Sequence, residues 1–203
     1  MTFFDHFAKT DVTALGALIE FKTKENEFNY IAKFLNSGSE ILEIGAGQGI
    51  LANIFSNNNF IHYDIVEPND IMQNNLIQGG CVRHAKNYFI PGLLEEDSSY
   101  DLIILTHLFQ HLNDCNEAKK CISEVRRVLK PNGLIFLVSP DYNDWKKDFH
   151  DCDFTHNYIT TLRHVKELFL GEDIEIIGHK HTYACFESLS GYLISKIIKI
   201  ATF

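Results

Sequence analysis

The sequence has no pair of cysteines at the Cys-x-x-Cys spacing that metal and redox sites use. Its five cysteines are scattered along the chain, at positions 81, 115, 121, 152 and 185. Neither a zinc knuckle nor a disulfide framework is predicted, because both need paired cysteines at short or regular spacings. We interpret the cysteines as reduced packing residues.

The sequence is also poor in positive charge. It carries 18 lysine and arginine residues against 27 aspartate and glutamate residues, which gives a formal net charge of −9. Duplex nucleic acid is bound mainly through lysine and arginine contacts to its phosphates, so this balance argues against a nucleic-acid partner. Small molecules are the expected substrates.

Long hydrophobic segments are missing as well. No apolar run approaches the ~20 residues of a membrane span, and the first twenty residues lack the basic start, apolar block and cleavage site of a signal peptide. A cytoplasmic location without a membrane span is therefore expected. With 203 residues, of which 45% are hydrophobic, the chain fits one globular domain over residues 1–203.

Short apolar runs alternate with segments of helical periodicity along most of the chain. Buried strands are predicted over 40–45, 61–67, 100–106 and 133–139. Helices are predicted over 49–57, 69–77 and 115–129, the last of them ended by a turn that Pro131 and Gly133 supply. Repeated strand, helix and strand units predict a parallel sheet with helices on both faces, which is the doubly wound α/β class.

Four further segments complete the predicted fold. An amphipathic helix within residues 5–35 forms an N-terminal cap over 1–37, and a helix over 159–170 ends at Gly171. Residues 172–187 have the pattern of two final strands in an edge hairpin. With an ill-defined third strand, the prediction is a Rossmann-like, mostly parallel, seven-stranded sheet with an antiparallel edge strand.

The tail over residues 190–203 sets Leu193, Ile197 and Ile200 against two lysines on a helical period. We expect it to dock on this domain or on a second subunit, because two lysines are too few for strong binding to an anionic membrane surface. A homodimer is therefore left open.

Three glycines follow the first predicted strand, at the end of the sheet where doubly wound folds bind ligands. Gly45, Gly47 and Gly49 would let a ligand lie directly on the backbone. A dinucleotide site would need its third glycine where Ile50 stands, and a phosphate-binding P-loop would need Gly-Lys-Ser/Thr, which is absent. A plain strand-to-helix turn is the structural alternative.

The run from Glu43 to Gly49, EIGAGQG, resembles the nucleotide-binding signature of class I S-adenosylmethionine-dependent methyltransferases. Glu67, which ends the second predicted strand 22 residues after Gly45, matches the acid that binds the ribose in that family. The later segments SYDLIILTHLFQHL and EVRRVLKPNGLIFLVSP resemble the family's fourth strand, its loop and the turn into its fifth strand. The resemblance covers roughly residues 38–140.

The resemblance implies S-adenosylmethionine as cofactor and S-adenosylhomocysteine as product. Glu67 would bind both ribose hydroxyls, Glu43 would lie near the cofactor's amino group, and Asn87 is a candidate for the adenine, where relatives carry an acid. The residues predicted to bind the cofactor are Glu43, Gly45, Ala46, Gly47, Gln48, Gly49, Glu67, Pro68, Asn87, Thr106, His107 and His111.

The acceptor side is predicted to lie in the loop 140–158, which is long and polar for a connection of this kind. Asp153, Phe154, Thr155 and His156 resemble an Asp-x-Thr-His element of methyltransferases associated with bacterial surface-polysaccharide and sugar pathways. His156 is the leading candidate for a catalytic base, with Asp153 orienting it or binding an acceptor hydroxyl. His107 is a second candidate to face the acceptor, and His111 is expected to support the loop that follows the fourth predicted strand.

Several alternatives stay open at this point. His150, Asp151, Asp153 and His156 could bind a metal that clamps a diol, although no metal is assigned. Trp145, Phe149 and Phe154 could form a wall for a sugar ring or could pack the loop against the sheet.

The activity expected is O-methylation of a small polar acceptor such as a sugar or nucleotide sugar. The alternatives are methylation of an amine or phosphate-type acceptor, a non-catalytic cofactor-binding partner subunit, and hydride transfer.

Overall fold

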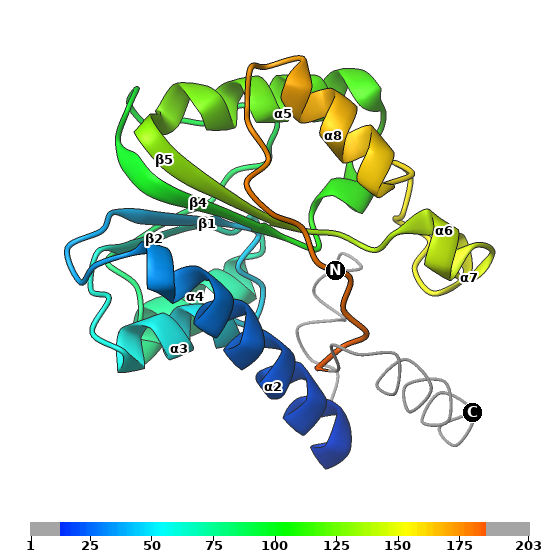
Figure 1. Cartoon of the computed structure of the whole chain (residues 1–203). Coiled ribbons are helices and arrows are strands. Elements are labelled where there is room, and N and C mark those ends of the chain that lie inside the picture. The colour runs from blue at the N-terminus through cyan, green and yellow to red at the C-terminus, as the bar shows by residue number, and fades with distance from the viewer. Residues whose placement is uncertain (1–12, 186–203) are drawn as a thin grey trace.

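The computed structural model describes residues 13–185, so the start of the predicted N-terminal cap and the predicted tail helix over 190–203 lie outside the described residues. The described chain forms a five-stranded, fully parallel sheet in the order β3-β2-β1-β4-β5 (Figure 1). The order reverses between β1 and β4, which in such sheets places a ligand crevice beyond their carboxyl ends. The strands are β1 (Ile41–Ile44), β2 (Tyr63–Val66), β3 (His84–Lys86), β4 (Tyr100–Thr106) and β5 (Leu129–Val138).

Helices cover both faces of the sheet, as the doubly wound pattern predicts. The helices α5 and α8 lie on one face, and α2, α3 and α4 lie on the other (Figure 1). Two short helices, α6 and α7, follow β5 beyond the carboxyl ends of the strands. The helical elements are α2 (Ala14–Ile31), η1 (Ala32–Phe34), α3 (Ile50–Asn57), α4 (Asp70–Gly79), η2 (Phe109–His111), α5 (Cys115–Val128), α6 (Tyr142–Trp145), α7 (Asp148–Asp151) and α8 (Leu162–Leu170).

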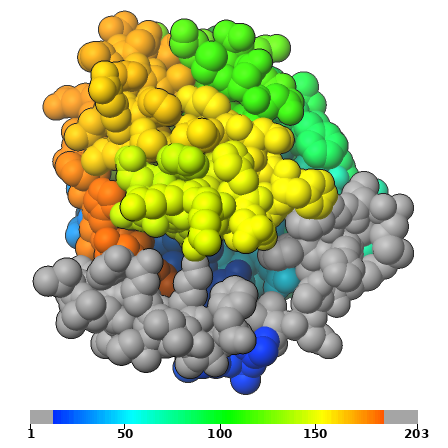
Figure 2. Space-filling view, turned by 90° about the vertical axis from the view of Figure 1, so that its right-hand side faces the viewer, coloured from blue at the N-terminus to red at the C-terminus, as the bar shows by residue number. Residues whose placement is uncertain are grey.

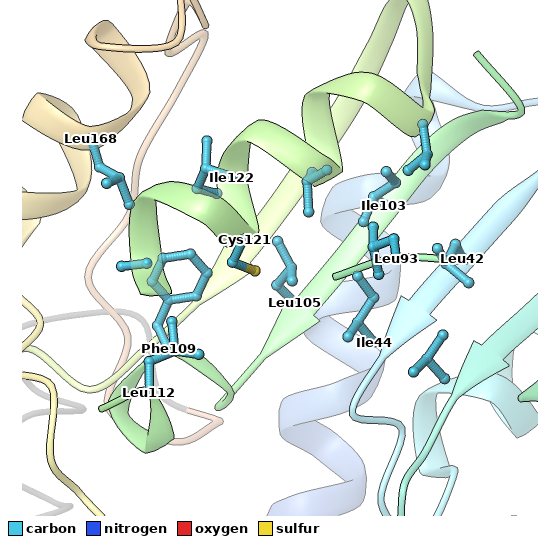
Figure 3. Close-up of a cluster of buried hydrophobic side chains, with 14 of the residues drawn as sticks. Leu42, Ile44, Leu93, Ile103, Leu105, Phe109, Leu112, Cys121, Ile122 and Leu168 are labelled. Atoms are coloured by element: carbon cyan, nitrogen blue, oxygen red, sulfur yellow. The ribbon is translucent and has the colours of Figure 1, made fainter. Parts of the chain in front are cut away.

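The hydrophobic core is split into two layers by the sheet, because successive strand residues point to opposite faces. Leu42 and Ile44 of β1 pack on the side of α5, where Ile122 and Phe109 complete the layer (Figure 3). Ile41 packs on the side of α2 and α3. Strands buried on both faces explain why the central segments read as near-continuous apolar runs.

The predicted strands and helices are largely confirmed, with small shifts of their ends. Helix α5 stops at Val128, where a turn was predicted, but β5 begins at once. The chain loops out between Leu129, which pairs with Tyr100, and Leu134, which pairs with Leu102. Asn132 in this irregularity has a φ of 63°. The third strand is only the three residues of β3, which explains why its pattern is weak.

The predicted count of seven strands and the predicted edge hairpin are not found among residues 13–185. Residues 172–185 contain no strand, and residues 186 and 187 lie outside the described part. The alternating residues Ile174 and Ile176 pack against the core layer of α5 and α8 instead of extending the sheet. The alternation of apolar residues in this segment therefore reflects the burial of their side chains. It does not reflect backbone hydrogen bonding to a neighbouring strand.

Candidate active site

The glycine turn between β1 and α3 uses backbone conformations that other residues rarely adopt. Gly45, Gly47 and Gly49 have φ angles of 76°, 54° and 72°, all in the left-handed region. At Gly49 the reason is also steric, because an added Cβ would lie 1.7 Å from a methyl carbon of Leu76. At Gly47 an added Cβ would meet no atom of the described residues within 4 Å. Gly47 is therefore where a ligand can lie directly on the backbone.

Glu67 lies immediately after β2, and its side chain is buried. Its Oε2 atom accepts a hydrogen bond from the backbone N–H of Gly47 at 2.8 Å, and its Oε1 atom accepts one from that of Asn69 at 2.9 Å. Burial raises the pKa of Glu67, and these two hydrogen bonds oppose the shift. Because a carboxylate offers about four lone-pair sites, Glu67 retains capacity for a diol such as a ribose.

Glu43 points from β1 toward the α2 side of the sheet and is buried there. The hydroxyl of Tyr63 donates a 2.8 Å hydrogen bond to its Oε2 atom. Burial raises the pKa of Glu43 to about 7, although the positive charge of Lys24 acts in the other direction. Glu43 is therefore readily protonated near neutral pH, and a cationic ligand group nearby would favour its charged form.

A lysine that the sequence did not single out lies beside Glu43. Lys24 of α2 donates hydrogen bonds from Nζ to Glu27 at 3.0 Å and to Oγ1 of Thr106 at 3.1 Å. This links α2 to the carboxyl end of β4. Sequence reasoning missed Lys24 and Glu27 because a Lys and a Glu three residues apart are usual on any solvated helix face.

The other predicted cofactor residues lie at the same end of the sheet. Ala46 is buried and Gln48 is exposed in the glycine turn, while Pro68 follows Glu67. Asn87 follows β3 and donates a short hydrogen bond to Asp70 at the start of α4. Thr106 ends β4. The contacts of these residues with a cofactor stay predictions.

His107 follows β4 in an unusual backbone conformation, with a φ of 54°. Its backbone N–H donates to the carbonyl of Val138 at 2.8 Å, which joins the carboxyl ends of β4 and β5. The residue is exposed, yet surrounding protein atoms lower its pKa to about 4 by desolvation, and the charges of Lys24, His111 and His156 add to this shift. His107 is therefore neutral at physiological pH. A left-handed backbone conformation at a residue other than glycine is strained, and at this place it favours a functional role.

Three predicted residues from two distant segments come together in one cluster. The rings of His111, in η2, and His156, in the loop after α7, lie edge to face with centroids 5.0 Å apart. One potential ligand atom from each of His111, Asp153 and His156 lies within 4.8 Å of the other two. His150 and Asp151, which the metal alternative included, are not in this group.

Thr155 organises the cluster. Its hydroxyl donates to Oδ1 of Asp153 at 2.7 Å, and Nδ1 of His111 lies 2.7 Å from the same hydroxyl oxygen. The backbone N–H of Thr155 also donates to Oδ1 of Asp153, at 2.8 Å. This contact joins His111 to the loop 140–158, and its expected support of the loop after β4 stays a prediction. Thr155 belongs to the predicted Asp-x-Thr-His element, but no individual role was predicted for it, because a threonine in a loop most often caps a nearby backbone group.

His156 is held from its other side by the loop. Its Nδ1 atom lies 2.6 Å from the carbonyl oxygen of Phe149, and its side chain is buried. Phe149 is fully buried, whereas Trp145 and Phe154 are 43% and 73% exposed. A wall made of all three aromatic residues is therefore not formed: Phe149 packs the loop, and the other two face outward.

The loop that carries the cluster is closed at its neck. The backbone N–H of Tyr142 donates to the carbonyl of Thr160 at 2.8 Å, and the hydroxyl of Ser139 donates to that of Thr160 at 2.8 Å. Thr160 in turn donates to the carbonyl of Pro140. Figure 2 shows the loop, coloured yellow-green to yellow, spreading over the face of the molecule that carries α6 and α7. The loop is compact and structured, and compact surface loops often carry function.

A parallel sheet with a left-handed glycine turn after β1 and a buried acid after β2 is typical of doubly wound folds that bind nucleotides. The family model described as "Methyltransferase domain" matches residues 19–177, which is more than half of the chain. The chain therefore belongs to the methyltransferase domain family. No match is found among curated proteins.

Solved structures agree with this assignment. A SAM-dependent methyltransferase from Archaeoglobus fulgidus matches with a TM-score of 0.66 at 18% identity, over 87% of this chain and 84% of the other. A putative sarcosine dimethylglycine methyltransferase from Galdieria sulphuraria gives 0.67 at 18%, over 97% and 77%. The complex of the Haloferax volcanii Trm112 methyltransferase activator with a putative methyltransferase gives 0.66 at 14%, over 96% and 92%. These likenesses concern the fold.

Family and fold together make the protein an S-adenosylmethionine-dependent methyltransferase. The residues present fit this cofactor, since open space adjoins Gly47 and the Glu67 carboxylate lies directly behind it. Within residues 13–185, no helix has the length and apolar character needed to cross a membrane.

Proposed function

We propose that the protein methylates a hydroxyl oxygen of a small polar acceptor. The observation that carries this proposal is the cluster of His111, Asp153 and His156, with His107 close enough to be affected by two of their charges. Methylation of an alcohol gains from a base that removes the hydroxyl proton, and imidazole is the usual base near neutral pH. An amine or phosphate-type acceptor has less need of such a group.

His156 is the proposed base. A carbonyl oxygen can only accept, so the contact with Phe149 requires the proton of His156 on Nδ1 and leaves a lone pair on Nε2. The hydroxyl proton would pass to Nε2 as the oxygen forms its bond to the methyl carbon, and the electrons of the broken carbon–sulfur bond would stay on sulfur. S-Adenosylmethionine supplies the methyl group when bound. His107 would accept a hydrogen bond from the acceptor.

Asp153 has a different proposed role from direct orientation of His156. Its hydrogen bonds run through Thr155 to His111, so it would set the position of His111 or bind an acceptor hydroxyl. The exposed rings of Trp145 and Phe154 offer surfaces on which a sugar could stack. With the Asp-x-Thr-His element, they support a sugar, a nucleotide sugar or a polysaccharide precursor as the acceptor.

The test begins with calorimetric titration of the full chain with S-adenosylmethionine and with S-adenosylhomocysteine, where we expect binding of both. A panel of nucleotide sugars, free sugars, amines and phosphorylated compounds is then screened for release of S-adenosylhomocysteine. For an active hydroxyl acceptor, His156→Gln should lower kcat roughly 10²- to 10⁴-fold with unchanged cofactor affinity. His164→Gln, which alters an exposed histidine of α8, is the matched control.

Two alternatives predict other results. The similarity to a putative sarcosine dimethylglycine methyltransferase supports an amine acceptor, for which turnover would be confined to amines and His156→Gln would stay fully active. The similarity to a methyltransferase solved with an activator supports a role in a complex with another subunit. A partner subunit without catalytic activity would bind the cofactor and turn over none of the acceptors.

A further inference from the structure

We propose that His111, Asp153 and His156 bind one divalent transition-metal ion. Two imidazoles and one carboxylate, with ligand atoms within 4.8 Å of one another, form the ligand set of many catalytic metal sites, in which the remaining positions stay open. The three side chains come from η2 and from the loop after α7, so the fold brings together His111 and Asp153, which are 42 positions apart in the sequence.

The hydrogen bonds around the cluster set the two rings as a metal site requires. The Thr155 hydroxyl donates its proton to Asp153, so its oxygen accepts from Nδ1–H of His111. The carbonyl of Phe149 accepts from Nδ1–H of His156. In both rings the lone pair therefore lies on Nε2. The side-chain amide nitrogen of Gln110 lies 3.4 Å from Nε2 of His111, so a metal ion would displace this contact. Histidines that bind metals almost always donate their other ring N–H to such a partner, which fixes the ring and raises its basicity.

Hydrogen bonds also fix the carboxylate of Asp153. Oδ1 of Asp153 accepts two hydrogen bonds from Thr155, which fixes the carboxylate and leaves its second oxygen to serve as a ligand. Nitrogen ligands lie about 2.0–2.1 Å from zinc, so neighbouring ligand atoms of a bound ion are ~3–3.5 Å apart. The three side chains would draw together by roughly 1 Å on binding, which a loop can accommodate.

The ligand set also indicates which ions fit. Imidazole suits Zn²⁺, Fe²⁺, Co²⁺ and Ni²⁺, whereas Mg²⁺ prefers oxygen ligands and retains its waters. The single carboxylate would offset part of the charge of the ion. His150 does not compete for the ion in this arrangement, because its Nδ1 atom is 2.8 Å from the carbonyl of His156 and lies outside the cluster.

The proposed role of the ion rests on the proposed oxygen methylation. A bound divalent ion lowers the pKa of a hydroxyl group that binds to it, so the acceptor would lose its proton without a strong base. His156 would then be a metal ligand, and the proton would pass to His107 or to water. The metal site and the base role of His156 are thus alternative uses of one lone pair, and an experiment can separate them.

The test titrates the full chain, freed of metal by a chelator, with Co²⁺, whose visible absorption reports its ligands. We expect one Co²⁺ per chain, displaced by Zn²⁺ and not by Mg²⁺. Asp153→Asn and His111→Gln should abolish the absorption, and Thr155→Val, which removes the hydroxyl that orients both ligands, should weaken binding about 10- to 100-fold. His164→Gln should bind Co²⁺ as the wild type does.

The outcomes separate this inference from the proposed function. Equal Co²⁺ affinity in the wild type and in the Asp153→Asn, His111→Gln and Thr155→Val variants would overturn the metal site. An absence of Co²⁺ binding by a protein that binds S-adenosylmethionine would also overturn it. Full methyl transfer to a hydroxyl acceptor by the metal-free protein would leave the oxygen methylation standing and remove the metal from it. Site-specific Co²⁺ binding without turnover of any hydroxyl acceptor would support the metal site and overturn the proposed function.

Discussion

The two sides of the candidate site are built by different means. On the cofactor side, the glycine turn is set by left-handed backbone conformations and by the hydrogen bond from Gly47 to Glu67. On the acceptor side, the loop 140–158 places side chains against one another, through Thr155 between Asp153 and His111. Backbone geometry and one carboxylate hold the first, and contacts between side chains hold the second. The cofactor side can therefore persist through wide changes of sequence, whereas single substitutions can remodel the acceptor side.

The strongest test of this difference is the removal of the Glu67 carboxylate. In Glu67→Ala, the ribose would lose two charge-assisted hydrogen bonds, roughly 1.5–3 kcal/mol each, so affinity for S-adenosylmethionine should fall at least ~100-fold. Calorimetric titration measures this, with Glu67→Gln as the milder variant. Unchanged affinity in Glu67→Ala would refute the proposed role of this residue.

Within the acceptor loop, two phenylalanines should behave oppositely. Phe149→Ala should lower the free energy of unfolding by about 3–5 kcal/mol, since it empties a fully buried position. Phe154→Ala should change it by less than about 0.5 kcal/mol, because that ring is exposed, and should act on the acceptor KM instead. Urea unfolding compares the two. Similar losses of stability would mean that the loop does not pack as described.

Two alanine substitutions in the glycine turn should also differ in their effects. Gly49→Ala should destabilise by about 2–5 kcal/mol, from left-handed strain of about 1–2 and overpacking against Leu76 of about 1–3. Gly47→Ala carries only the strain, and its new methyl group would occupy the open space proposed for the cofactor. Thermal unfolding should therefore rank Gly49→Ala as the less stable variant, while cofactor affinity should fall in Gly47→Ala. Wild-type affinity in Gly47→Ala would argue against contact there.

The smallest expected effect is the pH dependence that Glu43 gives to the free energy of unfolding. Its pKa of about 7 in the folded protein lies above its ordinary value of 4.5, so the folded state binds the proton more tightly than the unfolded state does. The stability contributed by Glu43 is complete below pH 4.5 and is lost as the pH rises through 7, up to ~3 kcal/mol. Glu43→Gln should remove this slope in urea unfolding measured from pH 5 to 8, whereas Glu20→Gln, an exposed control, should keep it.

The sequence predicted most of the fold, because the fold depends on periodicity and on glycines at fixed spacing, whereas the contacts of the cofactor residues stay predictions. The parallel sheet, the turn formed by the three glycines and the position of Glu67 after the second strand all follow from such patterns. It could not predict that His111 and His156 meet, because 45 positions separate them and only the fold closes the distance. It also could not foresee that Ile174 and Ile176 pack as irregular chain, since a period of two describes burial and not hydrogen bonding.

The closed neck of the acceptor loop gives the molecule a modular design. Hydrogen bonds join Thr160 to Ser139, Pro140 and Tyr142. None of these bonds involves a residue between 143 and 159. Changes between residues 143 and 159 that keep Phe149 buried and Tyr158 packed on the core should therefore leave β5 and α8 in their places. If the loop sets the acceptor, as we propose, then transplanting that stretch between relatives should transfer acceptor preference as a single unit.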